Sequence, residues 1–308
     1  MIYTVTFNPA IDYVLHMPVL RAGEVNRAAS GAIYYGGKGV NISCVLKTLG
    51  LSSTALAFVA GFTGAALRGG LEAAGIRTDC IELQTGLTRI NVKIKADTET
   101  DINANGPDIG EEAQNALYQK LDRLKAGDYL CLSGSVPPSS GDAAYEKILQ
   151  RLSGRGVEAV VDATGGLLLN VLKHRPFLIK PNGFELAEVL GAELRTAAEI
   201  EAGARRLQER GARNVLVSLA GDGAVLLTES GACHTIAAPA GRVRNSVGAG
   251  DSMVAGFLAG YIETGDLLYA LRLGTAAGSA TAFSDGLAER EEIDRLFRQI
   301  LPERTPEP

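Results

Sequence analysis

The stretch "NSVGAGDSMVAGF", residues 245–257, places Gly248, Ala249 and Gly250 directly before Asp251 at the start of an apolar helical pattern over residues 249–263. The first amides of a helix are unpaired and carry partial positive charge, so small residues there let the backbone bind an anion. Asp251 could then accept a hydroxyl proton while the amides hold a transferring phosphoryl group. An aspartate in a first turn can also do no more than complement the helix dipole. The fragment alone leaves both interpretations open.

A second Gly-rich stretch, "YYGGKGVN" at residues 34–41, carries Lys38 into another helical pattern. It is not a P-loop, because Gly39 rather than Ser or Thr follows the lysine, and it is not a dinucleotide fingerprint. A turn of this kind can be purely structural. The lysine and the amides of the following helix favour a role in holding a polar or phosphorylated ligand.

Two further motifs follow predicted strands. "IKPNGFEL" places Lys180, Asn182 and Glu185 just past a strand end, where ligands bind in open α/β sheets. The three-residue spacing of Asn182 and Glu185 also fits a capping box, so a purely structural role explains it equally well. "SLAGDGA", residues 218–224, could be only a hairpin turn, although a serine followed by Gly-x-Gly also suits the phosphates and ribose of a nucleotide.

Together these motifs resemble the ribokinase-type (PfkB) family of sugar kinases over essentially the whole chain. Eight of them occur in the order that the family shows: "NPAIDY", "GGKGVN", "TRINVKI", "SGSVP", "KPNGFE", "SLAGDGA", "NSVGAGDSMVAGF" and "GSATAFS". Each motif is weakly specific by itself, whereas eight in order are highly specific. No position expected to be catalytic departs from the family's pattern.

The resemblance implies roles for the matching positions. Asp251 is the implied base that deprotonates the acceptor hydroxyl, and Gly248, Ala249 and Gly250 are its implied anion hole. The implied sugar-phosphate contacts are Asp12, Gly37, Lys38, Asn41 and Arg89, with Ser135 and Arg27 as further candidates for that pocket. The implied ATP contacts are Lys180, Asn182, Glu185, Ser218, Gly221, Gly223, Gly250 and Ser279, with Glu185 holding Mg²⁺ through water.

The reaction implied by the resemblance is phosphoryl transfer from MgATP to a ketose phosphate, with fructose 1-phosphate converted to fructose 1,6-bisphosphate. A tagatose-6-phosphate kinase, which makes tagatose 1,6-bisphosphate, shares nearly all these motifs and is the alternative. A non-catalytic sugar-phosphate sensor is a rival of another class, but it would not need Asp251, Asn182 and Glu185, which this chain keeps. A Rossmann dehydrogenase is disfavoured because no G-x-G-x-x-G follows the first predicted strand.

The elements that must position these residues alternate along the chain. Short β-rich runs such as "IYTVTF", "TALAFVA", "DYLCLSG" and "EAVVDA" are separated by helical patterns. This alternation predicts an α/β fold with a mostly parallel central sheet flanked by helices, which the resemblance makes ribokinase-like. "NVLVSLAGDGAVLLT" predicts a hairpin within that sheet. Residues 1–308 are expected to form one kinase domain, with residues 302–308 as a disordered tail.

One segment breaks this rhythm. In "TRINVKIKAD", Ile90, Val92 and Ile94 alternate with polar residues, which predicts a strand with one wet face. With "ETDINAN" after it and a second excursion at residues 11–35, it predicts a small β-sheet lid around 11–35 and 87–105. A two-stranded ribbon cannot bury its apolar side alone. That side must pack on the parent domain or on a second copy, and the resemblance favours a homodimer joined through the lid.

Composition excludes several other classes. The formal charge of −5 and the lack of a Lys/Arg cluster argue against a nucleic-acid-binding surface. The three histidines are scattered without ligand spacing for a metal, and Cys44, Cys80 and Cys131 lie among apolar residues, which predicts buried structural thiols. The N-terminus does not read as a signal peptide, and no apolar run reaches the ~20 residues of a membrane helix. The sequence thus predicts a cytoplasmic enzyme.

Overall fold

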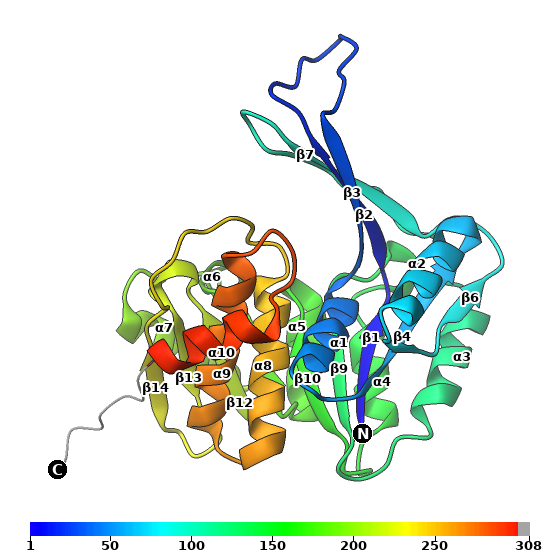
Figure 1. Cartoon of the computed structure of the whole chain (residues 1–308). Coiled ribbons are helices and arrows are strands. Elements are labelled where there is room, and N and C mark those ends of the chain that lie inside the picture. Colours follow the sequence, from blue (N-terminus) through cyan, green and yellow to red (C-terminus); the bar gives the residue numbers. More distant parts are fainter. Residues whose placement is uncertain (301–308) are drawn as a thin grey trace.

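The computed structural model describes residues 1–300 and contains two β-sheets, a large central sheet and a small sheet that stands above its upper edge (Figure 1). The central sheet has the strand order β14-β13-β12-β11-β10-β9-β1-β4-β5, with β6 paired to the end of β4. Neighbours from β12 to β5 run parallel, whereas β12, β13 and β14 form the predicted antiparallel hairpin and its extension. The strands are β1 (Ile2–Thr6), β4 (Ser53–Ala60), β5 (Arg77–Thr78), β6 (Ile81–Leu83), β9 (Tyr129–Ser133), β10 (Glu158–Asp162), β11 (Leu178–Ile179), β12 (Asn214–Ser218), β13 (Ala224–Leu227) and β14 (Cys233–Ile236).

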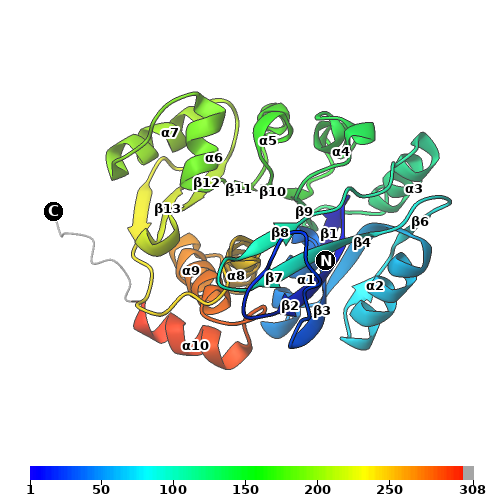
Figure 2. The same ribbon diagram turned by 90° about the horizontal axis from the view of Figure 1, so that it is seen from above.

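Helices cover both faces of this sheet, as the view from above shows (Figure 2). One face carries α3 (Glu111–Leu121), α4 (Ala144–Arg151), α5 (Gly165–Val171), α6 (Gly183–Leu190) and α7 (Ala197–Glu209). The other face carries α1 (Lys38–Thr48), α2 (Gly61–Ala73), α8 (Ala249–Thr264), α9 (Leu267–Ala282) and α10 (Arg290–Gln299). Short 3₁₀ turns are η1 (Pro138–Ser140), η2 (Leu172–His174) and η3 (Ala220–Asp222). The chain therefore has the predicted ribokinase-like architecture.

Burial on both faces explains why the strands read as continuous apolar runs rather than as alternating patterns. Every residue of β4 is buried, and the side chains of the central strands are shared between hydrophobic clusters on the two faces. Helix α8 is buried from Asp251 to Gly260 and packs closely on α9. A Cβ at Gly256 would lie 2.6 Å from the carbonyl oxygen of Leu273, so only glycine permits this approach. The helix that begins beside Asp251 is thus firmly held by the core.

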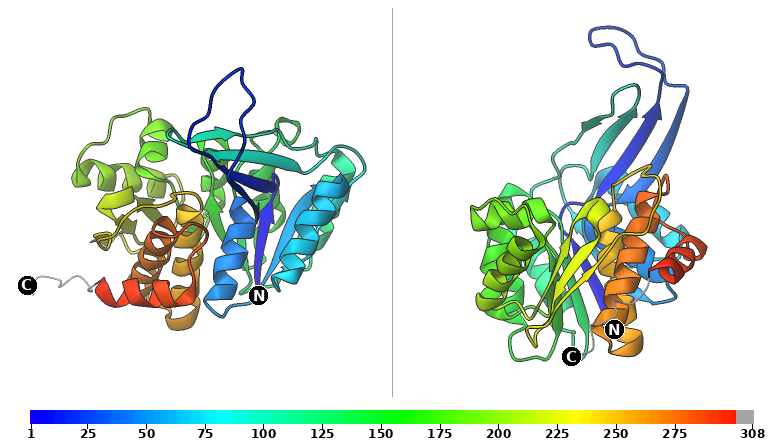
Figure 3. Two further views of the ribbon diagram at one scale, coloured as in Figure 1. Left: turned by 45° about the horizontal axis from the view of Figure 1, so that its top comes forward. Right: turned by 90° about the vertical axis from the view of Figure 1, so that its left-hand side faces the viewer.

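The small sheet is the predicted lid, and it consists of β2 (Ala10–His16), β3 (Ser30–Gly36), β7 (Arg89–Lys95) and β8 (Thr100–Ile102). Strand β2 lies at its centre, antiparallel to β3 and parallel to β7, and β8 pairs with β7 as the predicted hairpin. Two views show the lid rising over the edge at which the parallel strands end (Figure 3). The register places Asp12 beside Asn91 on one face, and Tyr13, Ile33 and Val92 on the other.

Three sequence predictions concern other parts of the chain. Within residues 1–300, each helix is too short or too polar to span a bilayer. Cys131 is fully buried as predicted, but Cys44 and Cys80 are only partly buried, because they lie at the margin of the cluster that α1 and α2 form on β4. Burial raises the pKa of the Cys44 and Cys80 thiols to about 11. The predicted disordered tail, residues 302–308, lies outside the described residues.

Candidate active site

Charged side chains gather where the parallel strands end beneath the lid. Strand β10 ends at Asp162, Lys180 directly follows β11, α1 begins at Lys38, and Asp251 lies in the first turn of α8. These four residues, which we term the charged cluster, act on one another electrostatically. Carboxyl ends of parallel strands share one edge of the sheet, and the helices that follow them begin there. The fold thus brings together residues more than two hundred positions apart.

Asp162 is at the centre of the charged cluster. Its carboxylate is fully buried and lies 3.1 Å from Nζ of Lys38 and 3.5 Å from Nζ of Lys180. Burial alone would raise the pKa of Asp162, but the charges of Lys180 and Lys38 hold it below its ordinary value. Burial likewise opposes the charge of Lys38, whereas Asp162 and Asp251 raise its pKa above the ordinary value. Both partners therefore stay ionised.

Asp162 is the one member of the cluster that was missing from the sequence-derived site. A weak signal was present, because an acid closes the otherwise apolar run "EAVVDA" at the carboxyl edge of a predicted strand. Polar residues also close β1, β9 and β12, at Thr6, Ser133 and Ser218. The side-chain hydroxyls of Thr6 and Ser133 are buried and have no hydrogen-bond partner among residues 1–300.

Asp251 is 4% exposed, and its Oδ2 accepts a hydrogen bond of 2.8 Å from Nδ2 of Asn41. Burial and the nearby negative charge of Asp162 raise the pKa of Asp251 to about 6, against the opposing effects of Lys38 and the Asn41 hydrogen bond. A carboxyl group with a pKa near 6 is a better proton acceptor than an ordinary aspartate and is still mostly ionised at neutral pH. The environment of Asp251 thus suits a general base.

The start of α8 offers an anion-binding surface next to this carboxylate. Gly248 has the left-handed φ of 80°, and a Cβ at Gly250 would lie 3.2 Å from Nζ of Lys180. The amide of Ala249 donates to the carbonyl of Ser246 at 3.3 Å, whereas the amides of Gly250 and Asp251 have no partner among the described residues. Of the three residues predicted from sequence, Gly248 and Gly250 have amides without a partner within residues 1–300, whereas the amide of Ala249 is paired.

The "GGKG" turn joins the lid to this site. Gly37 has φ of 121° and connects β3 to α1, and a Cβ there would lie 2.7 Å from the Thr6 side chain. A Cβ at Gly39 would lie 2.5 Å from Oγ1 of Thr6. Packing therefore requires glycine at both positions, because a side chain at either one would collide with Thr6 at the end of β1. The turn in this way places Lys38 and Asn41 in the site.

The lid contributes Asp12 from β2 and Arg89 from β7. Oδ1 of Asp12 accepts a hydrogen bond of 2.8 Å from Nδ2 of Asn91. The Arg89 guanidinium donates to the main-chain carbonyls of Asn8 at 3.1 Å and Ala104 at 3.5 Å, and its buried Nε has no partner in the described chain. Burial lowers the pKa of Arg89, while the charge of Asp12 opposes that effect. Arg89 thus sits at the base of the lid, close to Asp12.

The nucleotide-binding candidates lie along the next strand ends. Asn182 and Glu185 form the capping box at the start of α6, with both reciprocal hydrogen bonds at 2.8 Å. Ser218 closes β12 and pairs with Asn182 through an isolated bridge, so these two motifs are adjacent. Lys180, two residues before Asn182, belongs to the charged cluster through its ion pair with Asp162, so these motifs border that cluster.

The glycines of the "SLAGDGA" loop differ in what requires them. Gly223 has φ of 99°, and a Cβ there would lie 1.9 Å from the carbonyl oxygen of Ile236, so the hairpin itself requires glycine. Nothing lies within 4 Å of a Cβ at Gly221, so packing does not explain that glycine. Ser279 lies in the last turns of α9, one residue after Gly278, whose Cβ position is 3.0 Å from the carbonyl oxygen of Ala249. The end of α9 thus borders the start of α8.

Two further candidates, Ser135 and Arg27, differ in how close they lie to the charged cluster. Ser135 follows Gly134, whose amide donates to the main-chain carbonyl of Asp162 at 3.0 Å. Ser135 is exposed in the segment after β9, and Arg27 is exposed in the loop that joins β2 to β3 at the far end of the lid (Figure 1). Within residues 1–300, neither side chain forms a hydrogen bond or ion pair with the cluster. Their assignment to the sugar-phosphate pocket remains a prediction.

Comparison with known proteins agrees with this geometry. The pattern of the pfkB family carbohydrate kinases matches residues 5–293. This chain belongs to that family. The 1-phosphofructokinase of Bacillus subtilis is 43% identical over 300 residues, which cover 97% of this chain and 98% of the relative. The D-tagatose-1-phosphate kinase of Bacillus licheniformis is 38% identical over 303 residues, with 97% and 98% covered.

The architecture of this pfkB-family kinase also matches a solved structure. The crystal structure of phosphofructokinase-2 from Escherichia coli in complex with fructose-6-phosphate has a TM-score of 0.91 at 26% identity, covering 97% of this chain and 98% of that chain. The family, the fold and the enzyme class that the sequence motifs predicted are thereby confirmed: the protein is a carbohydrate kinase.

Proposed function

We propose that this kinase phosphorylates fructose 1-phosphate with ATP, giving fructose 1,6-bisphosphate. The observation that carries the proposal is the placement of Asp251. Its carboxylate is buried, hydrogen-bonded to Asn41, and adjacent to the unpaired amides at the start of α8. The 43% identity to a 1-phosphofructokinase over nearly the full length supports the choice of sugar. Phosphoryl transfer requires positioning and charge stabilisation more than covalent chemistry, which suits a site of this kind.

In the proposed reaction, Asp251 accepts the proton of the sugar hydroxyl as that oxygen attacks the terminal phosphoryl group of ATP. The bond from this phosphorus to the bridging oxygen breaks, and ADP leaves. Asn41 holds the carboxylate in place through its 2.8 Å hydrogen bond. The amides of Gly250 and Asp251, together with Lys180, oppose the negative charge of the phosphoryl oxygens. The lid above the site excludes water that would otherwise hydrolyse ATP.

The residues present fit a nucleotide that brings its own metal ion. Among residues 1–300, no three His, Cys, Asp or Glu side chains gather as a metal site. Mg²⁺ in kinases is usually held by one or two carboxylates together with the phosphates of the substrate, and it neutralises charge on those phosphates. Glu185 uses Oε2 to cap α6, which leaves Oε1 for a water of the ion. Asn182, Ser218, Gly221, Gly223 and Ser279 complete the proposed ATP site.

The sugar phosphate is proposed to lie between the lid and the charged cluster. Asp12, Gly37 and Asn41 face its hydroxyl groups, and Lys38 and Arg89 oppose the charge of its phosphate. Arginine suits a phosphate dianion through paired donors. Arg89 is now bonded only to carbonyl oxygens, which it can exchange for a phosphate. Ser135 and Arg27 are proposed to complete this pocket at its outer side.

The test is an ATP-coupled assay in which fructose 1-phosphate, fructose 6-phosphate, tagatose 1-phosphate and tagatose 6-phosphate are compared at equal concentration. Fructose 1-phosphate should give the highest kcat/KM. A tagatose phosphate is the second candidate, because a D-tagatose-1-phosphate kinase is 38% identical to this chain. A higher kcat/KM with a tagatose phosphate would replace the proposed sugar. No turnover with any of the four would favour a sugar-phosphate sensor instead.

The kinase is further proposed to form a homodimer through the lid. The lid face opposite Asp12 is apolar, and Tyr13, Ile33 and Ile102 on it are 39%, 56% and 56% exposed. A sheet of this size that exposes large apolar side chains has surface suited to a partner. Sedimentation of the wild-type protein should give the mass of a dimer at micromolar concentration. A monomer under these conditions would contradict the proposal.

A further inference from the structure

Two pairs of side chains in this molecule are built in the same way. In the core, Nδ2 of Asn41 donates to Oδ2 of Asp251 at 2.8 Å. In the lid, Nδ2 of Asn91 donates to Oδ1 of Asp12, also at 2.8 Å. In each pair an asparagine amide fixes one carboxylate oxygen and leaves the other oxygen without a partner among residues 1–300. The proposed reaction gives a role to Asn41, Asp251 and Asp12, but it gives none to Asn91.

The two pairs lie on either side of Gly36, the last residue of β3. A Cβ built on Gly36 would lie 3.2 Å from Oδ2 of Asp12 and 3.5 Å from Oδ1 of Asn41. The free oxygen of Asp12 is therefore the one directed toward the core pair. Asp12 and Asn91 are direct neighbours in the β2–β7 register, so the lid backbone itself holds this pair together. The space between the pairs is lined by oxygen acceptors, which is the chemistry that recognises hydroxyl groups.

The side chain of Asn91 also lowers the stability of the folded protein. It is 5% exposed, and its buried Oδ1 has no hydrogen-bond partner within the described chain. A buried amide oxygen without a partner disfavours the folded state, and an apolar side chain of similar shape would remove that cost. The neighbours of Asn91 along β7, Ile90 and Val92, are apolar. The one interaction that an apolar residue could not supply is the hydrogen bond to Asp12.

We propose that Asn91 is a positioning residue for sugar recognition: its Nδ2 holds Oδ1 of Asp12, so that Oδ2 is presented to a hydroxyl group of the ketose phosphate. Without this bond the Asp12 side chain could rotate. Substrate binding would then have to immobilise it, and the entropic cost would weaken the affinity for the sugar phosphate. The inference rests on the proposed function, because it assumes a phosphorylated sugar between lid and core. Asn91 acts through Asp12 and does not itself need to contact the substrate.

The experiment combines Asn91→Leu, Asp12→Asn and the double variant, with Lys93→Met as the matched control. Lys93 lies on the same strand and face as Asn91 and also donates to an aspartate, Asp101, at 3.0 Å. Asn91→Leu should raise the KM for fructose 1-phosphate about tenfold, with kcat and the KM for ATP within about threefold of wild type. Lys93→Met should leave all three unchanged. In the Asp12→Asn background, Asn91→Leu should have little further effect, because the residue through which it acts is already altered.

Several results would overturn the inference. An unchanged sugar-phosphate KM in Asn91→Leu would show that Asn91 has no role in sugar recognition. Equal increases in both KM values, or the same loss in Lys93→Met, would show that the effect comes from a structural role of the lid. Full additivity with Asp12→Asn would show that Asn91 acts independently of Asp12. Thermal melting checks the fold, and Asn91→Ala replaces Asn91→Leu if the leucine variant melts early. If wild-type enzyme turns over none of the sugars, the proposed function fails, and calorimetric binding of fructose 1-phosphate to the same variants then decides the inference.

Discussion

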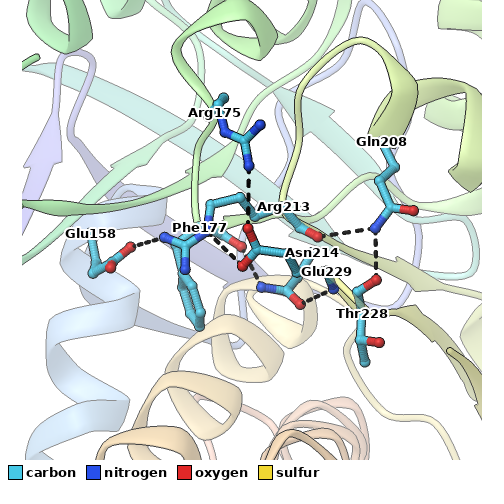
Figure 4. A network of polar contacts seen from close by, with 8 residues as sticks. All are labelled: Glu158, Arg175, Phe177, Gln208, Arg213, Asn214, Thr228 and Glu229. Carbon is cyan, nitrogen blue, oxygen red and sulfur yellow. Dashed lines mark hydrogen bonds and ion pairs between the residues drawn. The ribbon is translucent and has the colours of Figure 1, made fainter. Parts of the chain in front are cut away.

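Strand β10 has an acidic residue at each end, Glu158 at its amino end and Asp162 at its carboxyl end, and these two residues lie in different polar regions. At its amino end, Glu158 accepts a bond of 2.6 Å from Arg213, which also donates to Glu229 at 2.9 Å (Figure 4). At its carboxyl end, Asp162 belongs to the charged cluster. Both regions contain ion pairs between arginine or lysine and a carboxylate. They differ in how completely their polar groups are paired.

The amino-end region, which we term the Arg213 network, has partners for its buried polar groups. Nδ2 of Asn214 donates to the carbonyl of Phe177 at 2.8 Å, and its Oδ1 accepts from the amide of Glu229 at 2.9 Å. Gln208 donates to the carbonyls of Arg213 and Thr228 at 3.2 and 2.7 Å. Arg213 also lies over the Phe177 ring, 5.5 Å from its centroid. Arg175 adds a bond to Glu229 at the surface, as Figure 4 shows. This region is built for stability.

The carboxyl-end region leaves groups unpaired. The hydroxyls of Thr6 and Ser133 and the amides of Gly250 and Asp251 have no partner in the described part of the chain. Unpaired buried polar groups reduce folding stability, so they persist mainly where a ligand completes them. The contrast teaches that unsatisfied polar groups, rather than the number of charges, distinguish the charged cluster and its surroundings from the Arg213 network. Variants in the two regions should therefore change different quantities.

The largest expected effect is on turnover at the carboxyl end. Asp251→Asn removes the proposed proton acceptor with almost no change in shape, so kcat should fall by about 10²–10⁴-fold. Because the pKa of Asp251 is raised in the folded protein, its ionisation disfavours folding as the pH rises from about 4 to above 6. The asparagine variant should therefore melt at the same or a higher temperature at pH 7.5. Turnover within tenfold of wild type, measured by the ATP-coupled assay, would exclude Asp251 as the base.

The next effect is on stability at the amino end. Asn214→Leu removes one buried and one partly buried hydrogen bond and leaves the Glu229 amide unpaired, at a cost of about 1–3 kcal/mol. The Phe177 carbonyl keeps its bond of 3.1 Å from the main-chain amide of residue 214. Chemical denaturation should give a lower midpoint, while kcat and both KM values stay within about twofold of wild type. Asp251→Asn serves as the comparison, since it should show the opposite pattern. A loss of turnover in Asn214→Leu without loss of stability would contradict the division between the two regions.

The smallest expected effect is a shift in pH dependence. Since Asp251 must be ionised to accept a proton, wild-type kcat/KM, which reports the ionisation of the free enzyme, should decline below a midpoint near pH 6. Asp162→Asn removes a negative charge that helps to raise the pKa of Asp251, so the midpoint should move to lower pH even if the rate itself falls. A pH series from 4.5 to 8.5 on both proteins measures this shift. Midpoints that coincide, or a midpoint that moves upward, would show that Asp162 does not tune Asp251.

Much of the fold followed from local patterns in the sequence. The alternation of apolar runs with helical patterns indicated the parallel sheet, and the period of two in "TRINVKIKAD" indicated the lid strand. The capping box at Asn182 and the helix start at Ala249 were also readable, because they depend on residues a few positions apart. Such features arise from backbone geometry and side-chain periodicity, which short stretches of sequence encode directly.

The relations between distant side chains depended on the tertiary structure. Only the packing of strand ends places Asp162 between Lys38 and Lys180, and only the lid register sets Asn91 against Asp12. The same packing turns Arg89 onto carbonyl oxygens and leaves Arg27 out on the far loop of the lid. Contacts of this kind require elements far apart in the chain to meet within hydrogen-bond distance, and no local period records which side chains will meet. The sequence thus determined which residue types were available, and the shared edge of the parallel sheet decided which of them could act together.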